Sequence, residues 1–134
     1  MDENTEITVV MVKPGKKARL AAIGTSLEDL QRAVDGCIET FYPFEDPDVC
    51  IVLNDEGKIN GMQPNRAIYD GNGNVTDIVF GPFFICDCSG YEFGSLSEEK
   101  AEKYLEQFKL PEMFFRTQDG VKAIPYEPKK ELER

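Results

Sequence analysis

Short, continuous apolar runs, broken by turn residues, constrain this chain most. Residues 7–12 (ITVVMV) and 49–53 (VCIVL) carry no charged side chain and are rich in β-branched residues. Such runs are typical of strands that are buried on both faces of a sheet. A chain of 134 residues can bury about two-thirds of its unfolded surface. We therefore expect one domain built around a sheet with a proper core.

Turn residues separate the other strand-like segments. The dipeptide Pro14-Gly15 lies between the opening run and a short run at 19–23, at the spacing of a hairpin. Residues 37–44 (CIETFYPF) predict a further strand. The tetrapeptide 54–57 (NDEG) has hairpin-turn chemistry, so residues 58–62 are expected to return as a strand that pairs with the run before the turn.

Segment 75–88 is long for a single strand and is interrupted by Gly81-Pro82. Proline has no amide hydrogen to donate within a sheet, so we expect a bulge or bend here, or two strands in series. Near the C-terminus, residues 113–117 and 121–124 predict a small hairpin that turns at Asp119-Gly120.

Helix-start signals occur at two places. The segment 25–28 (TSLE) has the spacing of a capping box. Ser97 is followed by Glu98 and Glu99, which suit the positive end of a helix dipole. These elements predict an α+β fold: a mostly antiparallel β-sheet with two main helices on one face, and a short C-terminal hairpin or tail. We expect one domain at residues 1–125 and a polar, frayed tail at 126–134.

The chain contains no histidine. This excludes Ser-His-Asp and Cys-His catalytic arrangements and every metal site that needs histidine. No apolar run approaches the roughly 20 residues that span a bilayer, and residues 1–6 (MDENTE) are acidic, unlike a secretory signal. We therefore expect a cytoplasmic protein with no membrane partner.

The charge balance is acidic, with 25 Asp and Glu residues, 15 Lys and Arg residues and a net charge of −10. No basic block is present, so direct nucleic-acid binding is not expected. An acidic surface can imitate nucleic acid toward a basic partner, but the acids are scattered along the chain, and solubility is the simpler reason for their excess.

The four cysteines are Cys37, Cys50, Cys86 and Cys88. A zinc site usually shows two close pairs, whereas here only Cys86 and Cys88 are close in sequence. If that segment is extended, both thiols point to the same face of the strand. We expect small, largely buried thiols and no metal. The alternative, a site of four thiolates, requires Cys37 and Cys50 to converge on that face.

Asn65 and Arg66 stand out as candidates for chemistry. On a loop between a hairpin and a turn, an arginine fork beside an amide suits a phosphate, a carboxylate or a base edge. The alternative is structural: Arg66 pairs with Asp70 or Asp77, and Asn65 caps a turn. Lys13 adds a cation for an anionic ligand, although its charged turn lacks the spacing of a phosphate-binding loop.

Three motifs occur in a recognisable order: a strand ending in Lys13-Pro14-Gly15, a helix of the form S-L-E-D-L-Q, and a glycine with N-R-x-x-Y downstream, here Gly57, Asn65, Arg66 and Tyr69. This order resembles the family catalogued as domain of unknown function 3846 (DUF3846) over residues 7–110. The resemblance implies a protein of gut-type bacteria, their phages or conjugative elements, often near domains suspected of countering host defence. It implies no specific activity.

The resemblance and the lack of a catalytic constellation favour a small non-enzymatic binding protein of a phage or mobile element that counters host defence. It would hold a small anionic, nucleotide-like ligand through Asn65, Arg66, Tyr69 and Lys13, without a cofactor or metal, or it would dock on a host protein.

Two other functions remain open at the level of sequence. A hydrolase of nucleotide signals would use paired carboxylates such as Asp70 and Asp77. An acidic mimic of nucleic acid would block a host DNA-binding protein. In addition, Phe114 and Phe115 are adjacent and cannot both face inward from one strand, so one of them suits a homodimer seam or a ligand pocket.

Overall fold

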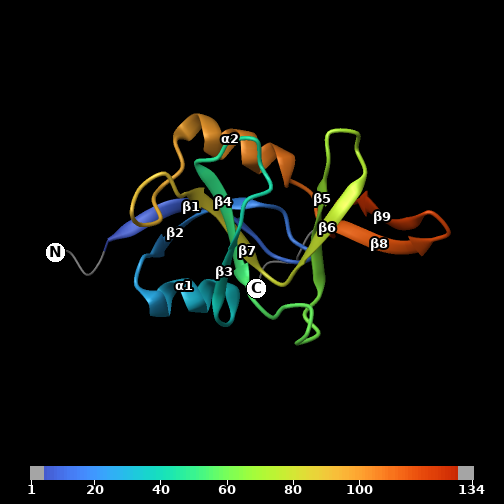
Figure 1. The fold of residues 1–134 in the computed structure, drawn as a ribbon, viewed down its shortest axis with the longest axis horizontal. Helices are drawn as coiled ribbons and strands as arrows, with labels where there is room; N and C mark the ends of the chain where they lie inside the picture. Colours follow the sequence, from blue (N-terminus) through green and yellow to red (C-terminus); the bar gives the residue numbers. More distant parts are fainter. Residues whose placement is uncertain (1–4, 130–134) are drawn as a thin grey trace.

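The computed structural model describes residues 5–129, in which the chain forms nine strands and two helices. Within this range, five strands make a central sheet in the order β2-β1-β7-β4-β3, and each neighbouring pair is antiparallel (Figure 1). The predicted runs at 7–12 and 49–53 are confirmed as interior strands. The strands of this sheet are β1 (Glu6–Val12), β2 (Arg19–Gly24), β3 (Ile38–Phe41), β4 (Val49–Asn54) and β7 (Phe83–Asp87).

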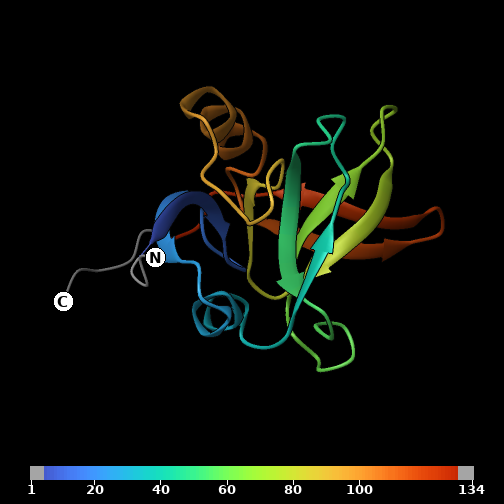
Figure 2. The same cartoon turned by 60° about the vertical axis from the view of Figure 1, so that its left-hand side comes forward.

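Helices α1 (Leu27–Val34) and α2 (Glu98–Gln107) lie on opposite faces of the central sheet (Figures 1 and 2). The prediction that both helices cover one face is therefore wrong. Alternate side chains of a strand point to opposite faces, and over residues 9–12 of β1 both sets are apolar and buried. Val9 packs in the core under α1, whereas Val10 packs in the core under α2. Each face therefore needs its own cover.

Helix α2 begins at the predicted cap, Ser97, whereas α1 is capped by Ser26, one residue after the Thr25 that the predicted capping box would use. The Ser26 hydroxyl accepts a hydrogen bond from the Asp29 amide at 3.1 Å, and the Ser97 hydroxyl accepts one from the Lys100 amide at 3.2 Å. These bonds satisfy amide donors that have no partner inside the helix. The last turn of α2 carries no basic residue.

Two small sheets lie beside the central one: β5 (Pro64–Tyr69) pairs with β6 (Val75–Phe80), and β8 (Glu112–Thr117) pairs with β9 (Gly120–Pro125). Segment 75–88 is thus two strands in series, one of the predicted options. Gly81, with a φ of 82°, and Pro82 lead the chain from β6 into β7 of the central sheet. Ile68 and Val79 of the β5–β6 sheet join the core under α2.

Residues 58–62 do not form the predicted strand. β4 pairs with β3 along one edge and with β7 along the other, so no edge is left for a returning strand. Residues 55–61 form successive turns instead. The Asn60 amide donates to the Glu56 carbonyl at 2.8 Å, and the Met62 amide donates to the Gly57 carbonyl at 3.0 Å.

The predicted C-terminal hairpin is confirmed as β8–β9. Phe114 and Phe115 project to opposite sides of it, and Phe115 is 46% exposed. Residues 126–129 lie outside any helix or strand. Part of the predicted polar tail, residues 130–134, and part of the acidic N-terminal segment, residues 1–4, lie outside the described residues. No helix among the described residues is long and apolar enough to cross a membrane.

Candidate ligand-binding site

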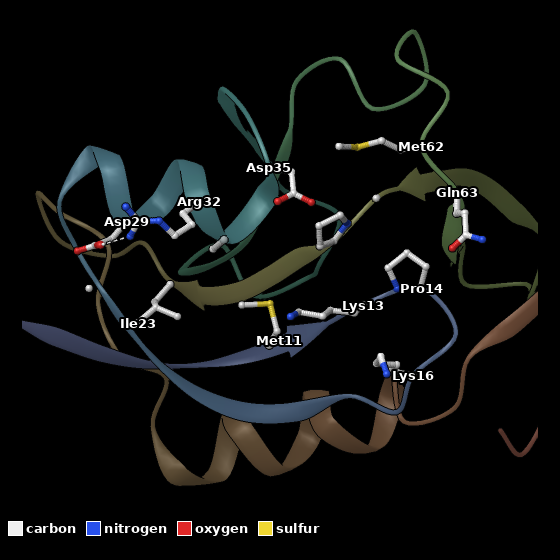
Figure 3. Close-up of a pocket in the computed structure, with 14 residues that line it drawn as sticks. Met11, Lys13, Pro14, Lys16, Ile23, Asp29, Arg32, Asp35, Met62 and Gln63 are labelled. Carbon is white, nitrogen blue, oxygen red and sulfur yellow. Dashed lines mark hydrogen bonds and ion pairs between the residues drawn. The ribbon is translucent and has the colours of Figure 1, made fainter. Parts of the chain in front are cut away.

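A pocket of about 600 Å³ lies between the β1–β2 loop, helix α1 and the chain that enters β5 (Figure 3). Its apolar lining comes from Met11, Pro14, Ile23, Ala33, Met62 and Pro82. Its charged and polar lining comes from Lys13, Lys16, Asp29, Arg32, Asp35 and Gln63. An apolar floor with a few polar groups around it is typical of small-molecule sites.

A tight turn brings Lys13 and Lys16 to one wall of this pocket. The Lys16 amide donates to the Lys13 carbonyl at 3.1 Å, and Pro14 and Gly15 occupy the two central positions. The φ of Gly15 is 76°. Proline followed by a glycine with positive φ is the pattern of a type II turn. The predicted turn at Pro14-Gly15 is therefore confirmed.

The facing wall is formed by the C-terminal part of α1. Arg32 Nη1 donates to Asp29 Oδ1 at 3.1 Å, so these two charges largely neutralise each other. Asp35 ends the helix in the left-handed conformation, with a φ of 62°. Its carboxylate points into the pocket, while the Lys13 side chain extends beside Met11 from the other side (Figure 3).

The charge of this pocket is opposite in sign to that of the whole chain. Lys13, Lys16 and Arg32 line it together with Asp29 and Asp35, which leaves a positive balance, whereas the chain has a net charge of −10. Arg32 is paired with Asp29, and the other two cations of the lining, Lys13 and Lys16, both come from the turn at residues 13–16, which we call the lysine turn. Such a local field concentrates small anions at the pocket.

Gly81 allows Met62 to close one side of the pocket. A Cβ atom at position 81 would lie 2.5 Å from Met62 Sδ, far inside van der Waals contact. The φ of 82° at Gly81 also belongs to the left-handed region that favours glycine. Gly81 therefore fixes both the path of the chain and the space for Met62.

Asn65 and Arg66 lie in β5, not on a loop as predicted, and each is only 1% exposed. Asn65 Nδ2 donates to the Val12 carbonyl at 3.0 Å and to the Gly81 carbonyl at 2.8 Å. Gly81 lines the pocket, and Val12 directly precedes Lys13. Asn65 thus holds two parts of the pocket wall from behind.

Arg66 donates to backbone carbonyls of distant segments. Its Nη2 atom donates to the Lys16 carbonyl at 2.7 Å and to the Phe108 carbonyl at 3.0 Å, and Nε reaches the same Phe108 carbonyl at 3.2 Å. Its Nη1 atom donates to Asn65 Oδ1 at 2.9 Å. The guanidinium therefore ties the lysine turn to the end of α2.

The place of Arg66 at the end of α2 explains why a cation is buried there. Phe108 is the C-cap of α2, whose last turn has no basic residue of its own. Arg66 supplies the positive charge that the negative end of a helix dipole favours. Burial lowers the pKa of Arg66 to about 10, and nearby Glu112 opposes this shift. Arg66 therefore stays protonated at neutral pH.

Tyr69 lies at the other end of β5 and contacts the C-terminal hairpin. Its hydroxyl is 3.4 Å from Glu112 Oε2, and Glu112 Oε1 accepts a hydrogen bond from the Ala67 amide at 2.8 Å. Burial raises the pKa of Glu112 and also that of Tyr69. These contacts join β8 to β5, away from the pocket.

Of the residues expected to bind a ligand, the structure places Lys13 in the pocket wall, Asn65 and Arg66 behind that wall, and Tyr69 elsewhere. Asp35 was not expected from the sequence to line a site; it ends α1 in the left-handed conformation at the position where glycine is usual. Met62 was not expected either, because that residue was assigned to a strand that does not form.

Cys50 and Cys86 are directly opposite each other in β4 and β7, with their Sγ atoms 4.0 Å apart. Cys88 packs against the same core as Cys86, as predicted. The hydrogen bond to Cys86 and burial raise the pKa of Cys50. Cys37 lies beside Asp55, at the far end of β4 from Cys50, and is exposed, so the expected burial is wrong for this thiol. The four thiols do not converge, and no group of ligands among residues 5–129 is arranged to hold a metal.

Asp70 and Asp77, the carboxylates of the hydrolase hypothesis, have other partners. Asp70 Oδ1 accepts hydrogen bonds from the amides of Asn74 and Asn72 at 2.9 and 2.8 Å, and these bonds lower the pKa of Asp70. Asp77 Oδ1 lies 3.2 Å from Lys58 Nζ. The predicted pairing of Arg66 with either carboxylate is therefore replaced by its bonds to backbone carbonyls.

Comparison with known proteins gave no match among curated proteins and none among solved structures. The model of one family, described as a domain of unknown function (DUF3846), matches residues 7–109. This range contains the central sheet except for Glu6, both described helices, Asn65, Arg66 and every residue that lines the pocket, and it ends before the β8–β9 hairpin. The resemblance found in the sequence is confirmed: the chain belongs to the DUF3846 family.

Proposed function

We propose that this protein is a small, non-enzymatic binding protein that holds a phosphate-bearing, nucleotide-like anion in the pocket between the lysine turn and α1. One observation carries the proposal. Lys13 and Lys16 stand at the wall of an apolar pocket, in a chain whose net charge is −10. Positive charge at the wall of a concave apolar site attracts an anion and favours its binding.

The size and lining of the pocket support such a ligand. Its volume of about 600 Å³ lies within the range of small-molecule sites, which is about 300–1,000 Å³. Met11, Ile23 and Met62 offer apolar surface to the flat face of a base. Lysine ammonium groups form charge-assisted hydrogen bonds with phosphate oxygens.

The buried residues Asn65 and Arg66 support the same function as positioning residues. Arg66 holds the carbonyl of Lys16, and Asn65 holds the carbonyls of Val12 and Gly81. A wall that is fixed before the ligand arrives loses less conformational entropy on binding. These residues therefore favour binding without contacting the ligand.

In the cell, such a protein would sequester a nucleotide signal in the bacterial cytoplasm and so counter host defence on behalf of a phage or mobile element. This part of the proposal is supported by what the family resemblance implies. Sequestration requires neither a cofactor nor a catalytic group, and it is lost when the ligand no longer binds.

Isothermal titration calorimetry of the full chain with ribose 5-phosphate and nucleoside monophosphates tests the proposal. Lys13→Ala should weaken binding about 10-fold, because a hydrogen bond to a charged group contributes about 1.5 kcal/mol. Lys17→Ala is the matched control: Lys17 directly follows the turn, lies outside the pocket lining and pairs with Glu127 at 3.3 Å. Failure of the unmodified chain to bind any of these compounds would contradict the proposal.

A second candidate function, docking on a protein surface, is favoured by the β8–β9 hairpin. Met113, Phe115 and Ile124 are 48%, 46% and 50% exposed, and Met113 lies directly opposite Ile124. A homodimer through this face would be detected by native mass spectrometry and lost in Phe115→Ser. A monomer in the unmodified protein at all tested concentrations would exclude the homodimer.

A further inference from the structure

We propose further that Asp35 makes this pocket selective for guanine nucleotides over adenine nucleotides, since its carboxylate enters the pocket opposite the lysine turn and accepts no hydrogen bond from any other of residues 5–129. This inference rests on the proposed function and names its ligand class. It assigns the phosphate to the lysine turn and the base to the wall formed by the end of α1.

Hydrogen bonds hold the backbone of Asp35 in place, whereas its side-chain carboxylate can still accept hydrogen bonds from a ligand. The Asp35 amide donates to the Arg32 carbonyl at 3.4 Å, and the Asp35 carbonyl accepts from Asn54 Nδ2 at 3.1 Å. Among residues 5–129, by contrast, no donor bonds the carboxylate, which points into the pocket (Figure 3). The neighbouring acid Asp29 differs, because it is already paired with Arg32.

Fold stability gives no reason for an aspartate at this position. Asp35 has a φ of 62°, and it is the one non-glycine residue with positive φ in the described chain. Glycine adopts this conformation without a steric penalty. The position also lies at the negative end of the α1 dipole, where an anionic side chain is disfavoured. An exposed acid that opposes the helix dipole and faces a pocket points to a role in binding.

Guanine matches a carboxylate better than adenine does. A carboxylate only accepts hydrogen bonds, and guanine presents N1–H and its exocyclic amino group side by side as two donors. Adenine presents one amino donor beside the N1 lone pair, which repels a carboxylate oxygen. Met11, Ile23 and Met62 then provide apolar contacts to the plane of the base, as the stacking surfaces of other base-binding sites do.

The test is a titration of the full chain with GMP, IMP and AMP, which carry the same ribose phosphate. We expect GMP to bind at least about 10-fold more tightly than AMP, the discrimination typical of a two-donor contact to a base edge. IMP, which keeps N1–H but lacks the exocyclic amino group, should lie between them. Equal binding of GMP and AMP would overturn the inference.

Variants of Asp35 test the preference for guanine over adenine separately from the affinity for the phosphate group. Asp35→Asn keeps the shape of the side chain and tolerates the left-handed conformation, so it should reduce the ratio of GMP to AMP affinity to about one while ribose 5-phosphate binds as before. Asp35→Gly is a second variant that removes the carboxylate without backbone strain, because glycine readily adopts the φ of 62° found at this position. Glu28→Gln, on α1 but outside the pocket lining, is the control and should keep the preference for GMP.

The outcomes distinguish this inference from the proposed function. If ribose 5-phosphate and all three nucleotides fail to bind, the proposed function fails and the inference fails with it. If the nucleotides bind but Asp35→Asn leaves the preference for GMP intact, only the inference is overturned. A loss of selectivity in Asp35→Asn, with a melting temperature at or above that of the unmodified protein, supports it and shows that stability was not the reason for the aspartate.

Discussion

At the scale of single residues, Arg66 joins segments that are far apart in the chain. Its guanidinium donates to the carbonyl of Lys16 in the β1–β2 loop and to that of Phe108 at the end of α2. Buried carbonyls need a donor once they have lost water, and here one side chain serves two of them. Arg66 therefore affects the pocket through the backbone that it holds.

Replacing Arg66 by alanine should lower the free energy of unfolding by about 3 kcal/mol, because the Phe108 and Lys16 carbonyls lose a buried donor and a cavity remains. Urea denaturation measures this change. Arg116→Ala, on the exposed end of β8, is the control and should cost less than about 0.5 kcal/mol. Equal stability of the Arg66→Ala and Arg116→Ala proteins would refute the structural role.

At the scale of elements, the connection from β6 to β7 determines both the change of sheet and the shape of the pocket. Gly81 has a φ of 82°, accepts a hydrogen bond from Asn65 and lies against Met62. Proline at position 82 stops β6 from continuing into β7. One glycine-proline pair thus separates two sheets and shapes the wall between them.

Alanine at Gly81 and alanine at Gly73 should have different effects on binding. Both glycines have positive φ, 82° and 84°, so each substitution should cost about 1 kcal/mol of stability. A Cβ at Gly73 meets no atom within 4 Å, whereas one at Gly81 would displace Met62. Gly81→Ala should therefore also weaken nucleotide binding in calorimetry, and Gly73→Ala should not. Unchanged binding in Gly81→Ala would argue against this pocket as the site.

The β8–β9 hairpin is joined to β5 through Glu112, and this contact should depend on pH. Burial raises the pKa of Glu112 above its ordinary value despite the attraction of Arg66, so the folded state binds this proton more readily than the unfolded state. Between the two pKa values, the free energy of unfolding contributed by Glu112 therefore falls as pH rises. At neutral pH, ionised Glu112 therefore lowers the free energy of unfolding.

Glu112→Gln should accordingly be more stable than the unmodified protein at pH 7 and lose this advantage as the pH falls through the raised pKa of Glu112. Glutamine keeps an acceptor for the Ala67 amide, so the backbone contact is retained. Urea denaturation at several pH values measures the difference, with Glu102→Gln on α2 as the control for removing one charge. A pH-independent difference for Glu112→Gln would contradict the prediction.

At the scale of the whole molecule, the acidic balance and the positive pocket respond to salt in opposite ways. A net charge of −10 destabilises the compact state through self-repulsion. Salt screens this repulsion, but it also screens the attraction between Lys13, Lys16 and a phosphate. Stability and affinity should therefore change in opposite directions.

Raising sodium chloride from about 0.05 M to about 0.5 M shortens the screening length several-fold. The free energy of unfolding should rise over this range, while the affinity for GMP should fall. Urea denaturation and calorimetry in the same two buffers measure both quantities. An affinity that does not change with salt would contradict the role assigned to the lysine turn.

Local chemistry in the sequence determined most of the elements. β-Branched runs gave β1 and β4, Ser26 and Ser97 started the helices, and Gly81-Pro82 ended β6. The strand predicted at 58–62 does not form, because β4 already pairs with β3 on one edge and with β7 on the other. Turn residues in the sequence cannot show that both edges of a strand are occupied. The opening run at residues 7–12, apolar except for Thr8, already indicated burial on both faces, and the structure has a helix on each.

The sequence by itself thus determined the strands, turns and caps, since each depends on neighbouring residues and their backbone preferences. The tertiary structure alone decided which face each helix covers, where Arg66 points and which residues line the pocket. These outcomes depend on contacts across long separations: Arg66 bonds Phe108 42 residues away, and Asn65 bonds Val12 53 residues away. The pattern of neighbouring residues in the sequence cannot reveal such a contact, because the contact forms only when buried polar groups find hydrogen-bond partners in the packed chain.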